Sequence, residues 1–303
     1  MFINITRSRK LWFSVSGFLF AASIAVSLLL PIRLGLDFTG GARWTVNFHE
    51  KPMERERVVS FFKSLDVLTQ EPQIQTTDEG YFLITIESLS DENIQKISDD
   101  MYKKVGEFDQ ISYRKVDSTI GKSFQRKAIS AIIITLVAIT LFIALAFRKV
   151  PKAINPWRFG IVTIVALFHD VFVVFGTFVI LGYFLNHVEM DLPFLTALLA
   201  TLGFSVNDTI VILDRVRENI RSQKMNETFE DTVEKSIQET LFRSLATSVS
   251  TVIPLLTLLF FGAESIFYFV LALAIGITIG TYSSIFIAAP LLVSWKNWSD
   301  ARE

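Results

Sequence analysis

Six long apolar stretches restrict what this chain of 303 residues can fold into more than any other feature. A helix needs about 20 apolar residues to cross the roughly 30 Å hydrocarbon core of a bilayer. Stretches that reach or approach this length cover residues 11–30, 128–147, 160–181, 192–213, 245–261 and 266–293. Charged residues make up only 19% of the chain, which is too few for an ordinary soluble domain. The sequence therefore predicts an α-helical membrane protein with six transmembrane helices.

The first stretch has an alternative interpretation as a cleavable signal peptide. Arg7, Arg9 and Lys10 form a basic region in front of it, as such peptides require. The apolar run is longer than a typical signal core, however, and it ends at Leu30 and Pro31 with no A-x-A cleavage site. These features favour a transmembrane helix.

The distribution of Lys and Arg predicts the orientation of the helices. Cytoplasmic loops close to spans collect basic residues. The loops at 182–191 and 262–265 have none, whereas the loops at 148–159 and 214–244 and both chain ends are basic. We therefore expect both termini in the cytoplasm. The predicted division is residues 1–30 for the cytoplasmic N-terminus and helix 1, 31–127 for an extracytoplasmic domain, 128–295 for helices 2–6, and 296–303 for a cytoplasmic tail.

The segment 31–127 holds 14 basic and 16 acidic residues, so it is predicted to be a water-soluble domain between helices 1 and 2. Its apolar residues alternate as in strands or recur every three to four positions as in helices. Strands are expected at 43–48, 73–76, 81–86 and 111–116, with a turn at Asp78-Glu79-Gly80, and helices at 53–66 and 90–105. The order βαββαβ predicts a small α+β, ferredoxin-like domain.

Gly35, Asp37, Gly40 and Gly41 lie at the entry to this domain. Glycines around one Asp are compatible with a binding loop. Two consecutive glycines beside a membrane serve a tight turn more often, because glycine accepts a positive φ without strain. The turn is the favoured interpretation.

Two acidic residues fall within the predicted spans, Asp170 and Asp208. A carboxylate near the bilayer centre costs about 2.5–3.5 kcal/mol on insertion scales, so such residues are candidates for function. Ser205 shares a helix face with Asp208, and Asn207 is its neighbour. His169 precedes Asp170, and we expect it to form a local hydrogen bond rather than to bind a metal.

The next span is antiparallel to the span of Asp208 and begins with Arg243, Thr247 and Ser248. The guanidinium of Arg243 is long enough to reach the depth of Asp208. One interpretation is a structural ion pair with hydroxyl bonds between helices. The other is a proton relay, in which Asp208, Arg243 and Asp170 change protonation or partner as access to water alternates. The sequence leaves both interpretations open.

Two weaker patterns concern packing. Gly276 and Gly280 form a G-x-x-x-G motif, which allows two helices to approach closely. Residues 228–241 have apolar side chains at steps of four, which predicts an amphipathic helix on the cytoplasmic surface.

Several functions are excluded or disfavoured by composition. The chain has no Cys and three His (His49, His169 and His187), with neither an H-E-x-x-H motif nor a phosphate-binding loop. We therefore expect no metal, no cofactor and no enzymatic activity. A formal net charge of −1 gives no indication of nucleic-acid binding. An intramembrane aspartyl protease built on Asp170 and Asp208 is disfavoured, because the expected G-x-G-D signature is missing.

Several stretches together resemble the SecD/SecF family of bacterial protein-export subunits, in the resistance-nodulation-division superfamily, and its SecF branch in particular. The resemblance covers nearly the whole chain, and the run from Asn207 to Asn219 is its most specific part. The matching stretches are residues 35–41, 168–171, 203–211 and 214–219, Arg243 with Thr247 and Ser248, and residues 279–285.

The resemblance implies a multi-pass protein of the bacterial inner membrane, forming one six-helix half of a unit with SecD. Such a unit would associate with the SecYEG channel, and with YajC or YidC, and would use the proton-motive force to move unfolded preproteins. Asp208 and Arg243 match the family's proton-linked residues. An alternative within the superfamily is a half-transporter that exports small molecules or lipids.

Overall fold

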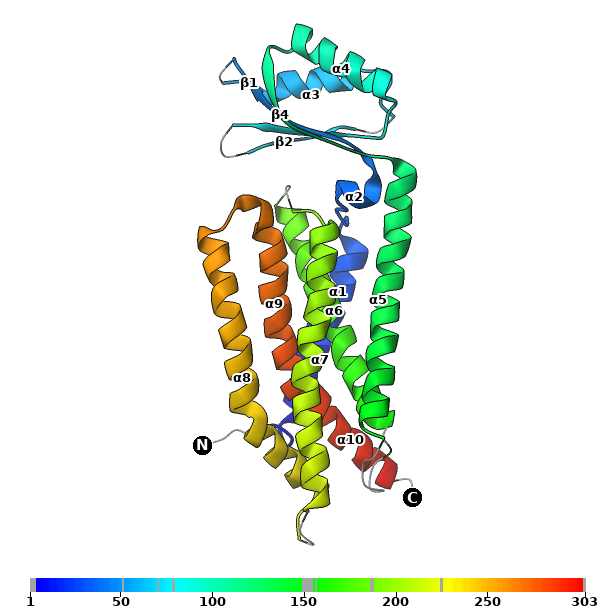
Figure 1. Ribbon diagram of the computed structural model, residues 1–303, viewed down its shortest axis with the longest axis vertical. Coiled ribbons are helices and arrows are strands. Elements are labelled where there is room, and N and C mark those ends of the chain that lie inside the picture. The colour runs from blue at the N-terminus through cyan, green and yellow to red at the C-terminus, as the bar shows by residue number, and fades with distance from the viewer. Residues whose placement is uncertain are drawn as a thin grey trace. The chain divides into compact units, whose positions relative to one another are not determined.

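The computed structural model describes residues 4–50, 52–69, 71–77, 80–148, 155, 157–185, 188–223 and 226–301. His187 and two residues of the predicted turn, Asp78 and Glu79, lie outside the described residues. The chain divides into two compact units (Figure 1). The helical unit consists of Met1–Ile32, Ser130–Phe184 and Pro193–Glu303, and the α/β unit consists of Arg33–Ile129 and Leu185–Leu192.

Six helical segments of the described residues are long and apolar enough to span a membrane. They confirm the prediction of six spans. The segments are α1 (Arg9–Leu29), α5 (Ser118–Ala146), α6 (Trp157–Phe184), α7 (Leu192–Arg221), α8 (Phe229–Phe261) and a sixth segment, Glu264–Asp300.

The sixth segment is not one regular helix. A short 3₁₀ turn, η1 (Glu264–Ile266), leads into α9 (Phe267–Ser283), a π-helical turn η2 (Ser284–Ala288) and α10 (Ala289–Asp300). Pro290 follows directly, near the start of α10. Because proline has no N–H to donate to the preceding turn, the regular α ladder cannot continue unbroken through this point.

The predicted amphipathic helix near 228–241 is not a separate element. It forms the first part of α8, which continues to Phe261. Thr228 begins the helix with a capping box, in which its hydroxyl accepts from the backbone N–H of Asp231. No Gly or Pro stands between residues 241 and 245, so nothing in the sequence ends the helix before the apolar part.

Glycines allow three close approaches between helices. A Cβ at Gly176 of α6 would lie 2.6 Å from Ser23 Cβ of α1. On α9, a Cβ at Gly276 would lie 2.3 Å from Thr201 Oγ1, and one at Gly280 would lie 2.8 Å from Ser205 Cβ. The G-x-x-x-G motif therefore lies where α9 packs against α7.

We expect Gly280→Ala to destabilise the protein by about 1–3 kcal/mol, because the added methyl would displace Ser205 from a packed contact. Thermal unfolding of the purified protein in detergent measures the effect. Gly203→Ala is the matched control, since a Cβ there meets no atom within 4 Å. Equal stability of the two variants would contradict the close contact.

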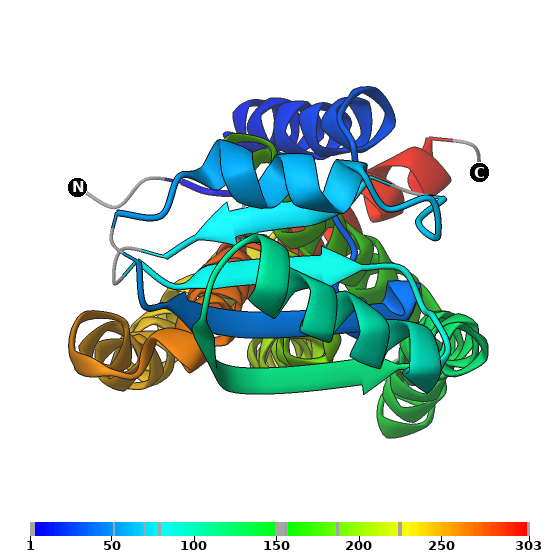
Figure 2. The ribbon, with the colours of Figure 1, turned by 90° about the horizontal axis from the view of Figure 1, so that it is seen from above.

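The α/β unit has the predicted ferredoxin-like topology. Its elements are α2 (Leu36–Thr39), β1 (Gly41–Phe48), α3 (Arg55–Lys63), β2 (Gln73–Thr76), β3 (Phe82–Ile86), α4 (Asp91–Lys104) and β4 (Phe108–Val116). The strands pair antiparallel in the order β2-β3-β1-β4. Figure 2 shows α3 and α4 lying side by side over one face of the sheet.

The sheet face under α3 and α4 is apolar, as the alternation in the sequence requires. Alternate residues of β1 are buried: Ala42, Trp44, Val46 and Phe48. They pack with Val58 and Phe62 of α3 and with Ile97 and Met101 of α4. This core forms without any residue of the helical unit.

Candidate functional site

Asp170 on α6 is completely buried inside the helical unit, and three side chains hydrogen-bond to it. Its Oδ2 accepts from Ser205 Oγ of α7 at 2.6 Å and from Ser283 Oγ of α9 at 2.8 Å. Its Oδ1 lies 3.1 Å from Nδ1 of His169. The expected local hydrogen bond of His169 is therefore present. The other ring nitrogen, Nε2, is buried and has no hydrogen-bond partner.

Asp208 on α7 is 5% exposed and is bonded by hydroxyls from the two following helices. Its Oδ2 accepts from Ser248 Oγ of α8 at 3.2 Å and from Thr281 Oγ1 of α9 at 3.0 Å. Ser248 and Thr281 are also hydrogen-bonded to each other. The carboxylate thus holds three helices together at one point.

A small cavity of ≈ 10 Å³ lies beside this carboxylate. A cavity needs roughly 10–15 Å³ to hold one water molecule, so there is space for about one beside Asp208. The cavity is lined by Phe204, Asn207, Asp208, Thr247, Ser248, Thr251, Ile277 and Thr281.

Hydroxyl groups extend from the surroundings of Asp170 toward Asp208. Ser284 Oγ of η2 lies 2.7 Å from Oγ1 of Thr209, which follows Asp208 in the sequence. The same hydroxyl donates to the backbone oxygen of Ser205 at 3.1 Å. Ser205 in turn donates to Asp170. The hydroxyl contacts thus run from Asp170 to Thr209, the residue after Asp208, but no hydrogen bond among the described residues joins them to the cluster of Asp208, Ser248 and Thr281.

The proposed pair of Asp208 and Arg243 is not formed in the described structure. Arg243 is exposed, and the hydroxyls of Ser248 and Thr281 bond to Asp208 instead. The physical reason is helical phase: Arg243 lies five residues before Ser248, so their side chains point about 140° apart around α8. Thr247 and Asn207 are also exposed and reach Asp208 only as walls of the small cavity.

Charge and apolar length in the sequence do not indicate three of the site residues, which are Thr281, Ser283 and Ser284. They entered only as part of a stretch that resembles the SecD/SecF family. The available signal was the run Thr281-Tyr282-Ser283-Ser284, in which four consecutive residues of a mostly apolar span carry hydroxyls that lipid cannot satisfy. Nothing in the local sequence indicates that they face Asp170 and Asp208.

The Gly35–Gly41 motif forms a tight turn within the α/β unit. Gly40 and Gly41 have φ values of 72° and 132°, which disfavour any residue with a Cβ. A Cβ at Gly41 would also lie 2.3 Å from the backbone oxygen of Ile86. Asp37 is buried, and its Oδ1 accepts from Arg114 Nη2 at 2.8 Å. Glycine is required here by close backbone contact.

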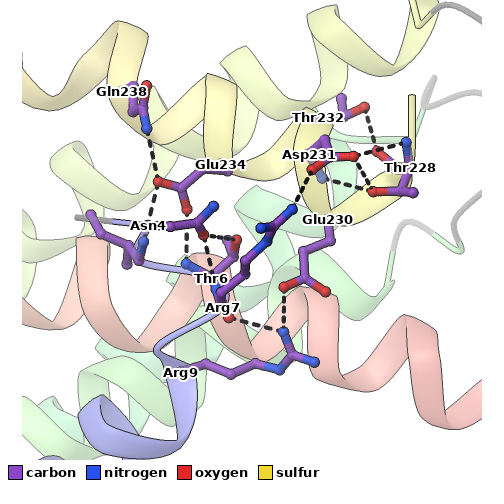
Figure 3. Close-up of polar contacts among 11 residues, drawn as sticks. Asn4, Thr6, Arg7, Arg9, Thr228, Glu230, Asp231, Thr232, Glu234 and Gln238 are labelled. Atoms are coloured by element: carbon purple, nitrogen blue, oxygen red, sulfur yellow. Dashed lines mark hydrogen bonds and ion pairs between the residues drawn. The ribbon is translucent and has the colours of Figure 1, made fainter. Parts of the chain in front are cut away.

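Another buried acid, Glu234 on α8, binds the amino-terminal segment of the chain (Figure 3). Its Oε1 and Oε2 accept the backbone N–H groups of Ile5 and Thr6 at 3.2 and 2.8 Å. Nearby, Arg9 pairs with Glu230 at 2.7 Å. Since α1 begins at Arg9, these bonds fix its start against the first turns of α8.

We expect Glu234→Ala to release this amino-terminal segment, because two backbone N–H groups would lose their acceptor at a cost of about 1–3 kcal/mol each when buried. Hydrogen exchange at Ile5 and Thr6 measures the release. Glu230→Gln is the matched control, since its partner Arg9 is partly exposed and surface pairs contribute little. Unchanged protection in Glu234→Ala would contradict the role given to Glu234.

Comparison with known proteins identifies the family. Residues 97–298 match the family described as protein export membrane protein SecD/SecF, C-terminal. The protein translocase subunit SecF of Thermobaculum terrenum is 40% identical over 306 residues, covering 97% of this chain and 94% of the relative. The SecF subunit of Anaerolinea thermophila is 35% identical, covering 98% and 96%.

Solved structures agree with the sequence relatives. The crystal structure of SecDF from Thermus thermophilus, a translocon-associated membrane protein, superposes with a TM-score of 0.82 at 31% identity, covering 97% of this chain. SecDF in a super-membrane-facing form gives a TM-score of 0.68 at 31% identity, covering 99%. In both cases this chain spans only 39% of the SecDF chain. The chain belongs to the SecD/SecF family of protein-export membrane proteins, and within that family to the SecF subunits.

Proposed function

We propose that this chain is the SecF half of a SecD–SecF unit that uses the proton-motive force to promote translocation of preproteins across the bacterial cytoplasmic membrane. Relatives that cover almost the same length are named protein translocase subunits. In the SecDF relatives this chain matches 39% of a longer protein. The fusion of the two parts in these relatives supports SecD as the partner of this chain.

The observation that carries the proton-linked part is the pair of buried polar clusters around Asp170 and Asp208. The two carboxylates lie within membrane helices and accept five side-chain hydrogen bonds, four from hydroxyls and one from the imidazole of His169. Among the described residues, no Lys or Arg forms an ion pair with either carboxylate. Hydroxyls can bond to a carboxyl group in either protonation state. One proton crossing 100 mV releases about 2.3 kcal/mol, which is enough to shift a balance between two helix arrangements.

The exposed polar face of α8 is the surface of this chain that we assign to contact with SecD. Arg243, Thr247 and Thr257 are exposed on a helix that is apolar enough to span a membrane. The hydroxyls of Thr247 and Thr257 donate to backbone oxygens of α8 itself, so Arg243 is the group of these three that lipid cannot satisfy and that a protein surface would cover. We place the helices of SecD against this face, where Arg243 would take part in the relay.

The remaining assignments follow from charge and family. Both termini lie in the cytoplasm and the domain 31–127 lies outside, in keeping with the distribution of Lys and Arg. The unit works with the SecYEG channel, and with YajC or YidC, on unfolded preproteins. The chain catalyses no covalent reaction, and the names of its relatives favour protein export over a small-molecule or lipid half-transporter.

Proteoliposomes with the Sec channel and its motor test this function. SecD alone, or SecD with this chain, is added, and the completed translocation of a preprotein is measured with and without an imposed proton gradient. We expect this chain to increase completion only when the gradient is present. Stimulation that a protonophore leaves unchanged would contradict proton coupling, and no stimulation in either condition would contradict the export role.

A further inference from the structure

The short connection between α6 and α7 belongs to the α/β unit rather than to the helical unit. Leu185–Leu192 clusters with Arg33–Ile129. Leu34 and Met190 form a parallel β-bridge. The backbone N–H of Gly35 donates to the oxygen of Met190 at 2.7 Å, and the N–H of Met190 donates to the oxygen of Arg33 at 2.9 Å. One isolated β-bridge and two backbone hydrogen bonds thus hold residues 188–191, here called the anchored segment, to the entry of the domain.

A side-chain ion pair also holds the anchored segment to the domain. Nη2 of Arg43, on β1, donates to Oε1 and Oε2 of Glu189 at 2.8 and 2.7 Å. The side chains are 24% and 12% exposed, so water screens the pair only in part. Arg43 is itself held by a hydrogen bond from its Nε to Thr85 Oγ1 of β3 at 2.8 Å. Glu189 is therefore anchored to two strands of the sheet.

The same contact reaches the first residue of α7. Oδ2 of Asp37 accepts the backbone N–H of Leu192 at 3.3 Å, and Oδ1 of Asp37 accepts from Arg114 on β4. Gly35 is required for the approach, since a Cβ there would lie 2.8 Å from Asp191 Cβ. Leu192, the first residue of α7, is thus held within the α/β unit by the Asp37 carboxylate.

α7 continues unbroken from Leu192 to Arg221 and carries Asp208. Sixteen residues separate Leu192 from Asp208, which is about 24 Å of helix. A continuous helix transmits an axial shift along its length, because its hydrogen bonds resist stretching. Displacement of α7 at Asp208 therefore acts on the anchored segment through the continuous chain.

We propose that the anchored segment, residues 188–191, held by Arg43 and Glu189, is the strut that transmits movement of α7 to the extracytoplasmic domain. Arg43 and Glu189 are positioning residues, and they act through α7 rather than by contact with a proton or a preprotein. The proposal rests on the proposed function, in which protonation at Asp208 moves the helices.

Charge exchange across the pair tests the strut. Glu189→Lys and Arg43→Glu are each expressed with SecD in cells depleted of the wild-type chain, and precursor maturation is followed by pulse-chase at matched membrane levels. We expect each single variant to slow maturation about fivefold or more, the lower end of typical coupling between sites. The double variant Arg43→Glu/Glu189→Arg restores the pair and is expected to recover most of the rate. Glu50→Gln is the control, because its pair with Arg57 is exposed in the same unit.

Two fluorescent reporters separate coupling from mere stability. The chain has no Cys, so a single label is placed at Ser60→Cys on α3 or at Ser222→Cys after α7. In SecD–SecF liposomes we expect an imposed proton gradient to change both signals in the otherwise wild-type protein. In Glu189→Gln the Ser222 signal remains and the Ser60 signal is lost.

Three results would overturn the strut. They are normal export by Glu189→Lys, no recovery in the double variant, or a Ser60 signal that persists in Glu189→Gln. With any of them, loss of export by Asp208→Asn would leave the proposed function standing. Normal export by Asp208→Asn would remove the proposed function, and the strut with it.

Discussion

Replacement of Asp208 by Asn is expected to leave preprotein secretion at the level of a strain that lacks the chain. Asn preserves the shape of the side chain and one acceptor oxygen for Ser248 and Thr281, so the helices should still pack. It cannot gain or lose a proton, and the relay would stop. Pulse-chase labelling of a secreted preprotein, at matched membrane levels of wild type and variant, measures the rate.

Asp214→Asn on the same helix is the control for this experiment. Asp214 is half exposed and pairs with Arg217 at 2.7 Å, which is a surface interaction of small energy. It should secrete like the wild type. Normal secretion by Asp208→Asn would make Asp208 a structural residue at most and would remove the mechanism proposed here.

Replacement of Asp170 by Ala is expected to give the largest loss of stability of any single change in the helical unit. The side chains of Ser205, Ser283 and His169 would lose their shared acceptor, at about 1–3 kcal/mol for each buried group left without a partner. A cavity would also remain in a completely buried position. The apparent unfolding temperature in detergent, read from intrinsic fluorescence, should fall by several degrees.

Asp170→Asn separates the structural from the proton-linked role. The amide keeps the volume and an acceptor oxygen, so most of the stability should return. If secretion also returns, Asp170 acts by holding α6, α7 and α9 together; if the stable variant fails to secrete, its proton is needed. A wild-type unfolding temperature for Asp170→Ala would show that the three hydrogen bonds contribute little.

The fold was largely predictable, because it depends on the length of the apolar stretches and on the spacing of apolar residues along the chain. Apolar length alone located all six spans, and the difference between alternation and helical spacing located the four strands and the helices α3 and α4 of the α/β unit. The short helix α2 was predicted only as part of a turn. The termini of the helices were less predictable. α8 extends 16 residues before the apolar stretch at 245–261, because polar residues such as Glu234 and Thr240 are good enough helix formers to continue it.

The candidate site was predictable on one helix and not between helices. The helical repeat correctly placed Ser205 and Asp208 on one buried face of α7. The partners on α9 and η2 depend on the rotation of a helix some 70 residues away, and periodicity carries no information about that. Arg243 was assigned to Asp208 from depth alone, and its phase around α8 rules the contact out in this structure.

The connection 182–191 shows the same limit. Its lack of Lys and Arg indicated the side of the membrane but not its partners. The pairing of Glu189 with Arg43 joins residues 146 positions apart, and only folding of the domain brings them together. Long-range ion pairs of this kind have no local signature in a sequence.

The π-helical turn η2 has a consequence for how this membrane span can evolve. A π turn holds one residue more than an α turn, so it rotates everything after it by about 100° relative to an unbroken helix. Ser284 faces Thr209 at one end of the turn, while Leu292 and Val293 pack in the core beyond it. Deletion of one residue within Ser284–Ala288 would restore a regular helix, and the lost residue and the lost extra rotation would cancel, so Leu292 and Val293 would still face the core. The turn is therefore the place where this span can lose a residue without rotating α10, whereas the same deletion within α9 would rotate every residue beyond it.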